Sequence, residues 1–467
     1  MADPLDRKRH SALPFVMFLA WLVWLPLPLG SNRPVWLALA VAWLCATLIV
    51  ILFKWLRRRF HLPRAFREAK TAWVVLFVFL LWQFLQLTAP AWMIPGFIHD
   101  AYQAARSSAP GITPDRYAGF EAMLVSIVVY GGFVCTLLLV DSMYRVKQLL
   151  WTLVWVGVVM SVITGITVMD GSQVQVLGVQ LTSNGTASGS FINRNHFANY
   201  LVMTLAAGIG LLMSMQDTRR GLSWRQRVQR MAETLLGPKA RLRVFLALMV
   251  ITLVLTRSRM GNSAFFLSLL VAGLITLVLI RGRQRSLFIL ISSLVAIDIF
   301  IVGTWFGVEQ VVDRIQATVS VEQDQVVINA QDRLDAITET TRMIRQAPLV
   351  GSGGGGYFAV FPQFRSQDQK FMDHAHNDYL EFTANYGIPA MLLWAWFLFL
   401  SLAKSLEQLK KRNHPLALGA SFTSLMAMIG MGIHSTVDFS LQIPANAVTF
   451  MVLLALPWVV SVSRKLV

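Results

Sequence analysis

A succession of long apolar stretches constrains this chain more than any other feature of its sequence. Twelve stretches are long enough to cross a hydrocarbon core of about 30 Å as helices of about 20 residues. They lie near residues 12–30, 35–53, 72–90, 119–140, 149–169, 195–214, 243–256, 262–280, 286–306, 387–403, 416–437 and 447–463. Only 14% of the 467 residues are charged, too few to cover a soluble globule of this size. The sequence therefore predicts an all-α integral membrane protein with about twelve transmembrane helices.

The distribution of basic residues predicts the orientation, because Lys and Arg near the ends of spans stay in the cytoplasm. Basic clusters occur at 7–9, 54–70, 219–243, 281–285 and 404–412, all on the side of the N-terminus. Both termini are thus expected in the cytoplasm and residues 307–386 outside. The formal net charge of +17 needs no nucleic acid to explain it, since this topology and contact with anionic lipids suffice.

Three regions follow from this topology. Residues 1–306 hold the first nine predicted spans, residues 307–386 form one large outer loop domain, and residues 387–467 hold the last three spans. Cys45 and Cys135 fall within predicted spans, so neither a disulfide nor a metal cluster is expected. Asp298 is the one carboxylate well inside a predicted span, where a structural partner is as good an explanation as a functional role.

The stretch from 348 to 387 holds the densest group of polar side chains. A glycine-rich run at 351–356 predicts a loop whose backbone bends sharply or approaches another segment closely. Asp378, followed three residues later by Glu381, predicts a capped helix start. His376 would then lie just outside a helix N-terminus, where free N–H groups favour anions.

Polar residues also occur at the outer ends of three other pairs of spans. These residues are Asn193, Arg194 and His196 before the sixth span, Arg257 and Arg259 in the short turn after the seventh, and His434 with Asp438 after the eleventh. Helix capping, snorkelling to lipid headgroups and a satisfied His–Asp pair are the simple structural explanations. All of them are nevertheless predicted at the same membrane face, where a helix bundle can bring them into one cleft.

The outer domain begins with a helical pattern. Leu334, Ile337 and Ile344 recur at spacings of three and seven, which predicts an amphipathic helix on the membrane surface or on the bundle. Arg333 and Arg342 would lie on or near its polar face. A solvated charged face is the ordinary explanation of these arginines.

Arginines and a histidine at a bilayer surface suit one kind of chemistry. A planar guanidinium binds phosphate through paired hydrogen bonds and never loses its charge, so arginines there fit a diphosphate whose tail lies in lipid. A neutral histidine beside them can accept a proton from an attacking hydroxyl. No Walker lysine loop or haem motif is present, and a reaction outside the cytoplasm needs a substrate that is already activated. A lipid-linked diphosphate sugar is such a substrate.

Three segments of the chain resemble one known family. The segments 189–198, 258–261 and 333–380, the last including His374-Ala375-His376-Asn377-Asp378, are similar to the superfamily of O-antigen ligases and polymerases. The resemblance covers residues 185–390, and the turn at 258–261 reads Ser-Arg-Met-Gly where Ser-Arg-Gly is usual. It implies a metal-independent glycosyltransferase of the GT-C kind, without a cofactor, in the bacterial inner membrane. Such enzymes transfer a glycan from undecaprenyl diphosphate to an acceptor hydroxyl on the periplasmic side.

The resemblance also implies roles for single residues. The family's essential histidine falls on His376, and its arginines fall on Arg259 and Arg194. We therefore expect His376 to act as general base in an inverting transfer and the two arginines to stabilise the leaving diphosphate. The candidate substrate-binding residues are Arg257, Arg333, Arg342, His374, Asn377, Asp378, Asn193, His196 and His434, and no metal ligand is expected.

The acceptor remains open at this stage. A ligase uses the lipid A core, a polymerase uses a second lipid-linked glycan, and a protein O-oligosaccharyltransferase uses Ser or Thr. One outer loop much larger than the others favours the ligase. A transporter and a non-catalytic assembly partner are the alternatives from other classes, but a carrier is expected to show internal repeats and polar groups near the bilayer midplane. The two halves of this sequence do not match each other.

Overall fold

The fold was analysed in a computed structural model. It describes residues 12–89, 96, 111–170, 175–176, 179–180, 182–183, 186–215, 237–280, 330–365, 373–411 and 414–462, and side chains are not described at 169–170, 175–183 or 330–334. The predicted ninth span at 286–306, with Asp298, lies outside the described residues. Residues 307–329, the first part of the predicted outer loop, also lie outside the described residues.

Helices make up nearly all of the regular structure. The α-helices are α2 (Ala12–Trp24), α3 (Pro34–Leu56), α4 (Arg64–Glu68), α5 (Lys70–Thr88), α7 (Arg116–Leu139), α8 (Met143–Asp170), α9 (Arg194–Ser214), α11 (Pro238–Leu255), α12 (Arg259–Leu279), α15 (Ala330–Gln346), α16 (Tyr357–Val360), α17 (Asp378–Lys411), α18 (Pro415–His434) and α19 (Pro444–Val462). Short 3₁₀ turns η1 (Leu29–Ser31), η3 (Phe361–Gln363) and η4 (Ser440–Gln442) connect them. Two antiparallel pairs of two-residue strands, β1 (Gln175–Val176) with β2 (Val179–Gln180) and β3 (Thr182–Ser183) with β4 (Thr186–Ala187), follow α8.

Nine of the described helices are long and apolar enough to cross a membrane. They are α3, α5, α7, α8, α9, α12, α17, α18 and α19, which confirms an all-α integral membrane protein. The count of twelve is not confirmed. The first predicted span ends early, because α2 covers only 13 residues and Pro26 and Pro28 follow it.

The centre of the bundle is formed by α9, α18 and α19. Of the 18-residue apolar segment of each helix, 94%, 78% and 89% of the residues are buried in α9, α18 and α19. In α3 and α5, at the edge of the bundle, the shares are 28% and 22%. Small residues allow this packing. Gly210 of α9 and Gly419 of α18 approach so closely that a Cβ on either would lie 2.5 Å or less from the carbonyl oxygen of the other. Thr423 donates across the same contact to the carbonyl of Ala206 at 3.0 Å.

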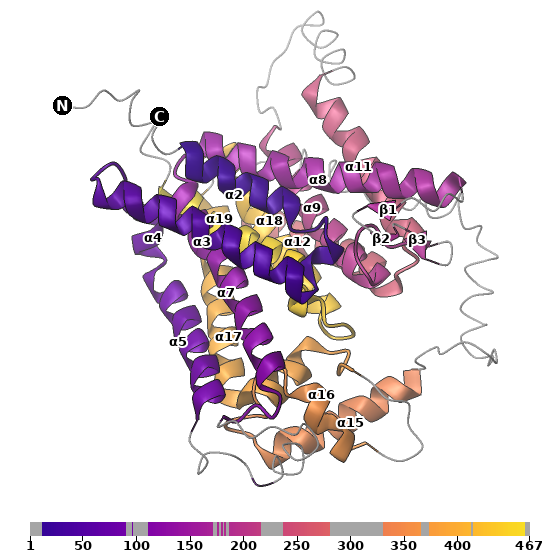
Figure 1. Ribbon diagram of the computed structural model, residues 1–467. Helices are drawn as coiled ribbons and strands as arrows, with labels where there is room; N and C mark the ends of the chain where they lie inside the picture. Colours follow the sequence, from indigo (N-terminus) through magenta and orange to yellow (C-terminus); the bar gives the residue numbers. More distant parts are fainter. Residues whose placement is uncertain are drawn as a thin grey trace, which may run out of the picture.

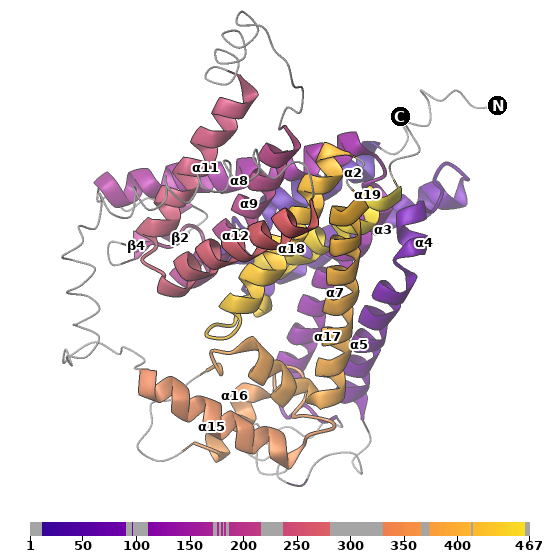
Figure 2. The same cartoon turned by 180° about the vertical axis from the view of Figure 1, so that it is seen from behind.

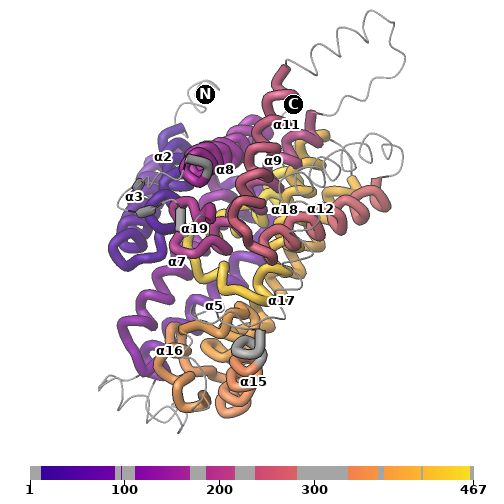
Figure 3. Tube along the Cα trace, turned by 90° about the vertical axis from the view of Figure 1, so that its right-hand side faces the viewer, coloured from indigo at the N-terminus to yellow at the C-terminus, as the bar shows by residue number. Residues whose placement is uncertain are grey.

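A second group of helices runs at a steep angle to this centre. In Figures 1 and 2, α5, α7 and α17 descend side by side from the central helices to α15 and α16 at the lower end. Figure 3 shows the same arrangement from the side. At the opposite end, Glu68, the last residue of α4, pairs with Lys404 of α17 at 3.4 Å and accepts a hydrogen bond from Ser461 of α19 at 3.1 Å. Three segments that the basic-residue pattern places in the cytoplasm thus meet at one end of the bundle.

The glycine-rich loop closes onto a kink in α17. Gly387 has φ of 81° and ψ of 165°, and a Cβ there would lie 2.3 Å from the carbonyl oxygen of Leu349. Gly353, with φ of 83°, donates its N–H to the carbonyl of Asn385 at 2.8 Å. Gln86 of α5 donates to the carbonyls of Val350 at 2.6 Å and Asn385 at 3.0 Å. The predicted boundary between residues 386 and 387 therefore falls at a kink within one helix.

Helix α15 packs on this outer layer with a different face from the one predicted. Ala336, Thr340 and Met343 are buried, whereas Ile337 and Ile344 are only half-buried. The Thr340 hydroxyl forms a 2.9 Å hydrogen bond with the hydroxyl of Tyr357. The helix is amphipathic as expected, and its buried face also includes Glu339.

The orientation can be tested with single cysteines. In a chain whose Cys45 and Cys135 are replaced by Ala, we expect Arg345→Cys on the exposed face of α15 to react with a membrane-impermeant maleimide in cells with a permeabilised outer membrane. Lys410→Cys, exposed at the end of α17, should react only after the membrane is dissolved in detergent. The reverse labelling pattern would place every candidate residue on the wrong side of the membrane.

Candidate active site

The segment 373–378 leads into α17 through a cap made by Asn377. The Asn377 side chain accepts the N–H of Leu380 at 3.1 Å and donates to the carbonyl of Thr436 at 3.0 Å. The prediction that Asp378 caps this helix is wrong. Asp378 is buried and accepts instead from the hydroxyl of Ser435 at 2.9 Å and the N–H of Leu441 at 3.1 Å. Asp378 and Asn377 thus fasten the loop after α18 to the start of α17.

Glu381 holds the histidine loop with both carboxylate oxygens. It lies one turn into α17, is 2% exposed, and has one oxygen 2.8 Å from Nδ1 of His374 and the other 2.8 Å from the N–H of Ala375. Burial lowers the pKa of His374, but the charge and hydrogen bond of Glu381 outweigh it and raise the pKa above its ordinary value. Asp373 and Asp378 act in the same direction. Sequence reasoning gave Glu381 only a capping role.

One aromatic ring brings three histidines together. His374 stacks on Phe439 with a centroid distance of 3.9 Å, His376 meets the same ring edge-on at 5.3 Å, and His196 does so at 4.7 Å. His376 has φ of 48°, a left-handed conformation that is uncommon for a residue with a side chain and that clusters at functional sites. The structure therefore brings His374, His376 and His196 into one cluster.

A buried polar network lies beside this cluster. Nε2 of His196 is 3.4 Å from a carboxylate oxygen of Asp438, and Nδ1 of His434 is 3.2 Å from the hydroxyl of Ser440. Asn446 donates to the carbonyl of His196 at 3.0 Å. His434 is fully buried and His196 is 3% exposed. Both histidines thus lie against buried polar groups of the bundle, and the substrate contacts predicted for them stay predictions.

The predicted arginines lie on helix starts or on the surface. Arg194 and Arg259 are the first residues of α9 and α12, and Arg257 lies in the turn before α12 with φ of 53°. Asn193 caps α9 by accepting the N–H of Asn195 at 2.8 Å, and Ser258 caps α12 by accepting the N–H of Gly261 at 3.1 Å. The side chains of Arg194, Arg257, Arg259 and Arg342 are exposed, and that of Arg333 lies outside the described side chains.

The starts of α9 and α12 lie against each other. A Cβ on Gly261 would be 2.5 Å from Cβ of Ala198, so Arg194 and Arg259 occupy the same end of the bundle. Of the two arginines in the turn, Arg259 belongs to the first turn of a 21-residue helix, where N–H groups and the helix dipole favour an anion. This placement favours Arg259 over Arg257 for contact with a phosphate.

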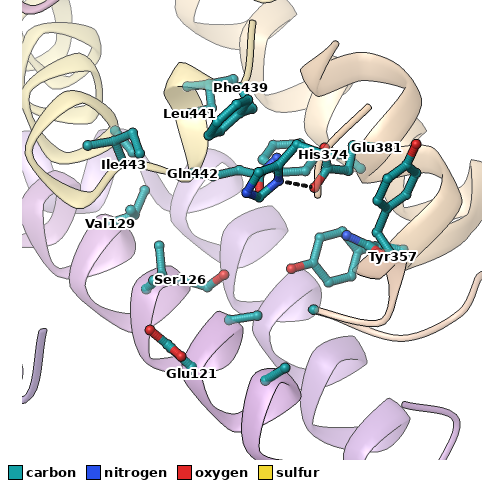
Figure 4. Close-up of a pocket in the computed structure, with 18 of the residues that line it drawn as sticks. Glu121, Ser126, Val129, Tyr357, His374, Glu381, Phe439, Leu441, Gln442 and Ile443 are labelled. Carbon is teal, nitrogen blue, oxygen red and sulfur yellow. Dashed lines mark hydrogen bonds and ion pairs between the residues drawn. The ribbon is translucent and has the colours of Figure 1, made fainter. Parts of the chain in front are cut away.

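A cavity of about 380 Å³ opens beside His374. It is enclosed by α5, α7, α16, α17, α19 and the loop around Phe439. Figure 4 shows the His374 ring between Glu381 and the open space, with Glu121 and Ser126 of α7 below and Gln442 above. His376 does not belong to the lining, and its Nε2 is buried. Among the described residues, no group of three His, Cys, Asp or Glu side chains is arranged to hold a metal ion.

Sequence reasoning missed Glu121 and Phe439. Glu121 lies inside the predicted fourth span, where an ionisable residue is itself a signal of function. Phe439 follows Asp438 directly, but nothing in its local sequence distinguishes it from the many other phenylalanines. Its role comes from the tertiary packing of α9, α17 and α19.

The comparison with known families agrees with this arrangement. A family model described as O-antigen ligase matches residues 244–395, which span α11, α12 and the histidine loop. This confirms the resemblance found in the sequence and places the region in the O-antigen ligase superfamily. Arg194, His196, Glu121 and Phe439 lie outside the matched residues. No curated protein matches the chain.

The shared ring gives a direct test of the cluster. We expect Phe439→Ala to lower glycosyl transfer by about 10- to 100-fold, because misplacement of catalytic groups by about 1 Å can cost that much. Phe399→Ala is the matched control and should keep full activity, because the Phe399 side chain of α17 is 55% exposed. Turnover of both purified variants is the measurement. A fully active Phe439→Ala enzyme would show that the three rings do not act as a unit.

Proposed function

We propose that this protein is an O-antigen ligase-like glycosyltransferase, which moves a glycan from undecaprenyl diphosphate to a hydroxyl of the lipid A core. The observation that supports this best is the cluster around Phe439. It joins a histidine–carboxylate pair to a second histidine, at the end of the bundle where arginines begin α9 and α12, and His374, His376 and Glu381 lie within the matched region. The reaction is proposed to take place on the periplasmic side of the bacterial inner membrane and to need no metal ion.

The acceptor hydroxyl oxygen attacks the anomeric carbon of the donor sugar opposite the diphosphate. The new glycosidic bond forms as the bond from that carbon to the diphosphate oxygen breaks, so the configuration inverts. His376 accepts the hydroxyl proton, and the diphosphate leaves with the electron pair. Because Nε2 of His376 is buried, its ring has to turn toward the acceptor when substrates bind, a change that is common between free and substrate-bound sites.

The leaving diphosphate is assigned to the starts of α9 and α12. Arg194 and Arg259 carry fixed positive charges there, and the first N–H groups of both helices add to the positive potential. Arg342 on the exposed face of α15, and Arg333 of the same helix, are proposed to hold more distant parts of the donor. The long prenyl tail stays in the bilayer.

The acceptor can be identified by deletion in the native host. Loss of a ligase should leave bare lipid A core while long polymer accumulates on undecaprenyl diphosphate. Loss of a polymerase, the second candidate, should leave core that carries a single repeat unit. Mass spectrometry of the core and the lipid-linked pool distinguishes the two outcomes. Fully decorated core, with a different glycan or a glycoprotein missing, would contradict the ligase proposal.

Replacement of the two loop histidines tests the mechanism. His376→Ala should lower turnover by about 10²- to 10⁴-fold, the usual contribution of a general base, while His374→Ala should lower it by about tenfold or less. His61→Ala, exposed at the opposite end, is the control. Arg259→Ala should weaken donor binding as well as rate, since the diphosphate is charged before and after the transition state. The measurement uses a purified lipid-linked donor in excess EDTA. An active His376→Ala enzyme would leave the mechanism without its base.

A further inference from the structure

The cavity beside His374 is lined by both polar and apolar side chains. Asn32, Glu121, Asp373, His374, Glu381 and Gln442 contribute the polar part of its lining, and side chains such as Leu76, Leu80, Val129, Trp394 and Met451 contribute the apolar part. Its volume of about 380 Å³ falls in the range of small-ligand sites, which is about 300–1,000 Å³. The cavity is thus large enough for a ligand group with both polar and apolar faces.

The charges around the cavity disfavour a diphosphate. Three carboxylates, Glu121, Asp373 and Glu381, belong to the lining, and no Arg or Lys among the described residues does, although Arg33 lies near enough to attract the charge of Glu121. A diphosphate among them would meet like charges in a partly enclosed site, where electrostatic repulsion is stronger than in water. Neutral sugar hydroxyls fit the same groups, because each hydroxyl can donate to a carboxylate or an amide oxygen. Aromatic side chains, among them Tyr357, Phe358 and Phe439, offer apolar surfaces to a sugar ring.

His374 presents one nitrogen to this cavity. A carboxylate can only accept a hydrogen bond, so Nδ1 of His374 carries the hydrogen that it shares with Glu381 at 2.8 Å. In the neutral ring, Nε2 is then an acceptor. The ring cannot turn freely, because it stacks on Phe439 at an interplanar angle of 18° and Glu381 is fixed by its second bond to the N–H of Ala375. Figure 4 shows the ring edge opposite Glu381 turned toward the open space.

We propose that this cavity is the acceptor-sugar site, in which His374, held by Glu381, accepts the hydrogen bond of an acceptor hydroxyl other than the one that His376 deprotonates, and Glu121 binds a further hydroxyl of the same sugar. The inference rests on the proposed glycosyl transfer and deepens it. Glu381 is a positioning residue, since it acts through His374 and Ala375. Acceptor and donor then approach from different sides, the acceptor from the carboxylate-lined cavity and the diphosphate from the starts of α9 and α12.

The proposal has a consequence for pH dependence. The groups that face His374 or its stacking partner are Glu381 and Asp378 of α17, Asp373 and His376 of its own loop, Glu121 of α7, Tyr357 of α16 and His196 of α9. Glu381 raises the pKa of His374, so the neutral ring forms only as the pH rises through that raised value. The acceptor KM should therefore fall as the pH rises through it. An uncharged Gln at 381 no longer stabilises the protonated ring, so the inflection should move to lower pH.

The experiment measures KM for each substrate separately, with purified lipid A core as acceptor and an undecaprenyl-diphosphate glycan as donor. Glu121→Gln should raise the acceptor KM about tenfold, which corresponds to one hydrogen bond to a charged group, and leave the donor KM within about twofold. Glu381→Gln should raise the acceptor KM and shift its pH inflection downward. Arg259→Ala is the counterpart and should act mainly on the donor KM. Glu407→Gln, at the far end of α17, should change neither.

The outcomes separate the two proposals. If the wild-type enzyme transfers no glycan to the lipid A core, the proposed function is contradicted. If it does transfer, but Glu121→Gln changes the donor KM or neither KM, the acceptor-site inference alone is contradicted. Phe358→Ala, a second change in the cavity lining at a side chain that is 57% exposed, covers the case in which Glu121→Gln does not fold. An unshifted pH inflection in Glu381→Gln would contradict the role given to His374.

Discussion

The backbone clamp at the kink of α17 is the constraint on which the site depends. The N–H of Ile388 bonds to the carbonyl of Pro348 at 2.8 Å, and Gly387 leaves no room for a side chain beside Leu349. Because of the kink at Gly387, the outer turns of α17 run in a different direction from its long apolar part. Those turns carry Glu381, whose two hydrogen bonds fix His374 and the backbone of Ala375. Without the clamp, the histidine loop would lose its anchor.

Charge is divided between two parts of the outer end. Glu121 on α7 and Asp378 and Glu381 in the first turn of α17 are carboxylates, whereas exposed arginines begin α9 and α12. In the proposed reaction this division favours the anionic donor at the arginines, because the carboxylates repel its diphosphate. The histidines around Phe439 lie between helices of both groups, α9 on one side and α17 on the other.

The sequence predicts the chain-wide features of this fold well and its contacts poorly. Apolar periodicity locates the long helices, and the glycine-rich run predicts the sharp loop in which Gly351, Gly353 and Gly355 have positive φ. Capping rules choose Asp378, but tertiary contacts with Ser435 and Leu441 take that carboxylate and leave the cap to Asn377. Phe439 is invisible to local rules, since its neighbours in space come from segments far apart in the chain. Glu121 is marked in the sequence only as an ionisable residue in a predicted span. Motifs identify His374 and His376, but only packing shows that Glu381 fixes one of them.

The two sides of the site also differ in rigidity, for a physical reason. Burial of a polar group costs free energy unless the group is hydrogen-bonded. Here Asp378 and Asn377 form hydrogen bonds that connect the loop at 435–441 to the start of α17. The backbone of the histidine loop is therefore held in place before any substrate arrives, and in the proposed reaction only the ring of His376 has to turn. Arg194 and Arg259, in contrast, are exposed. In the proposed transfer the acceptor side is thus rigid and the donor side adaptable, which suits a reaction in which the attacking hydroxyl has to be placed accurately.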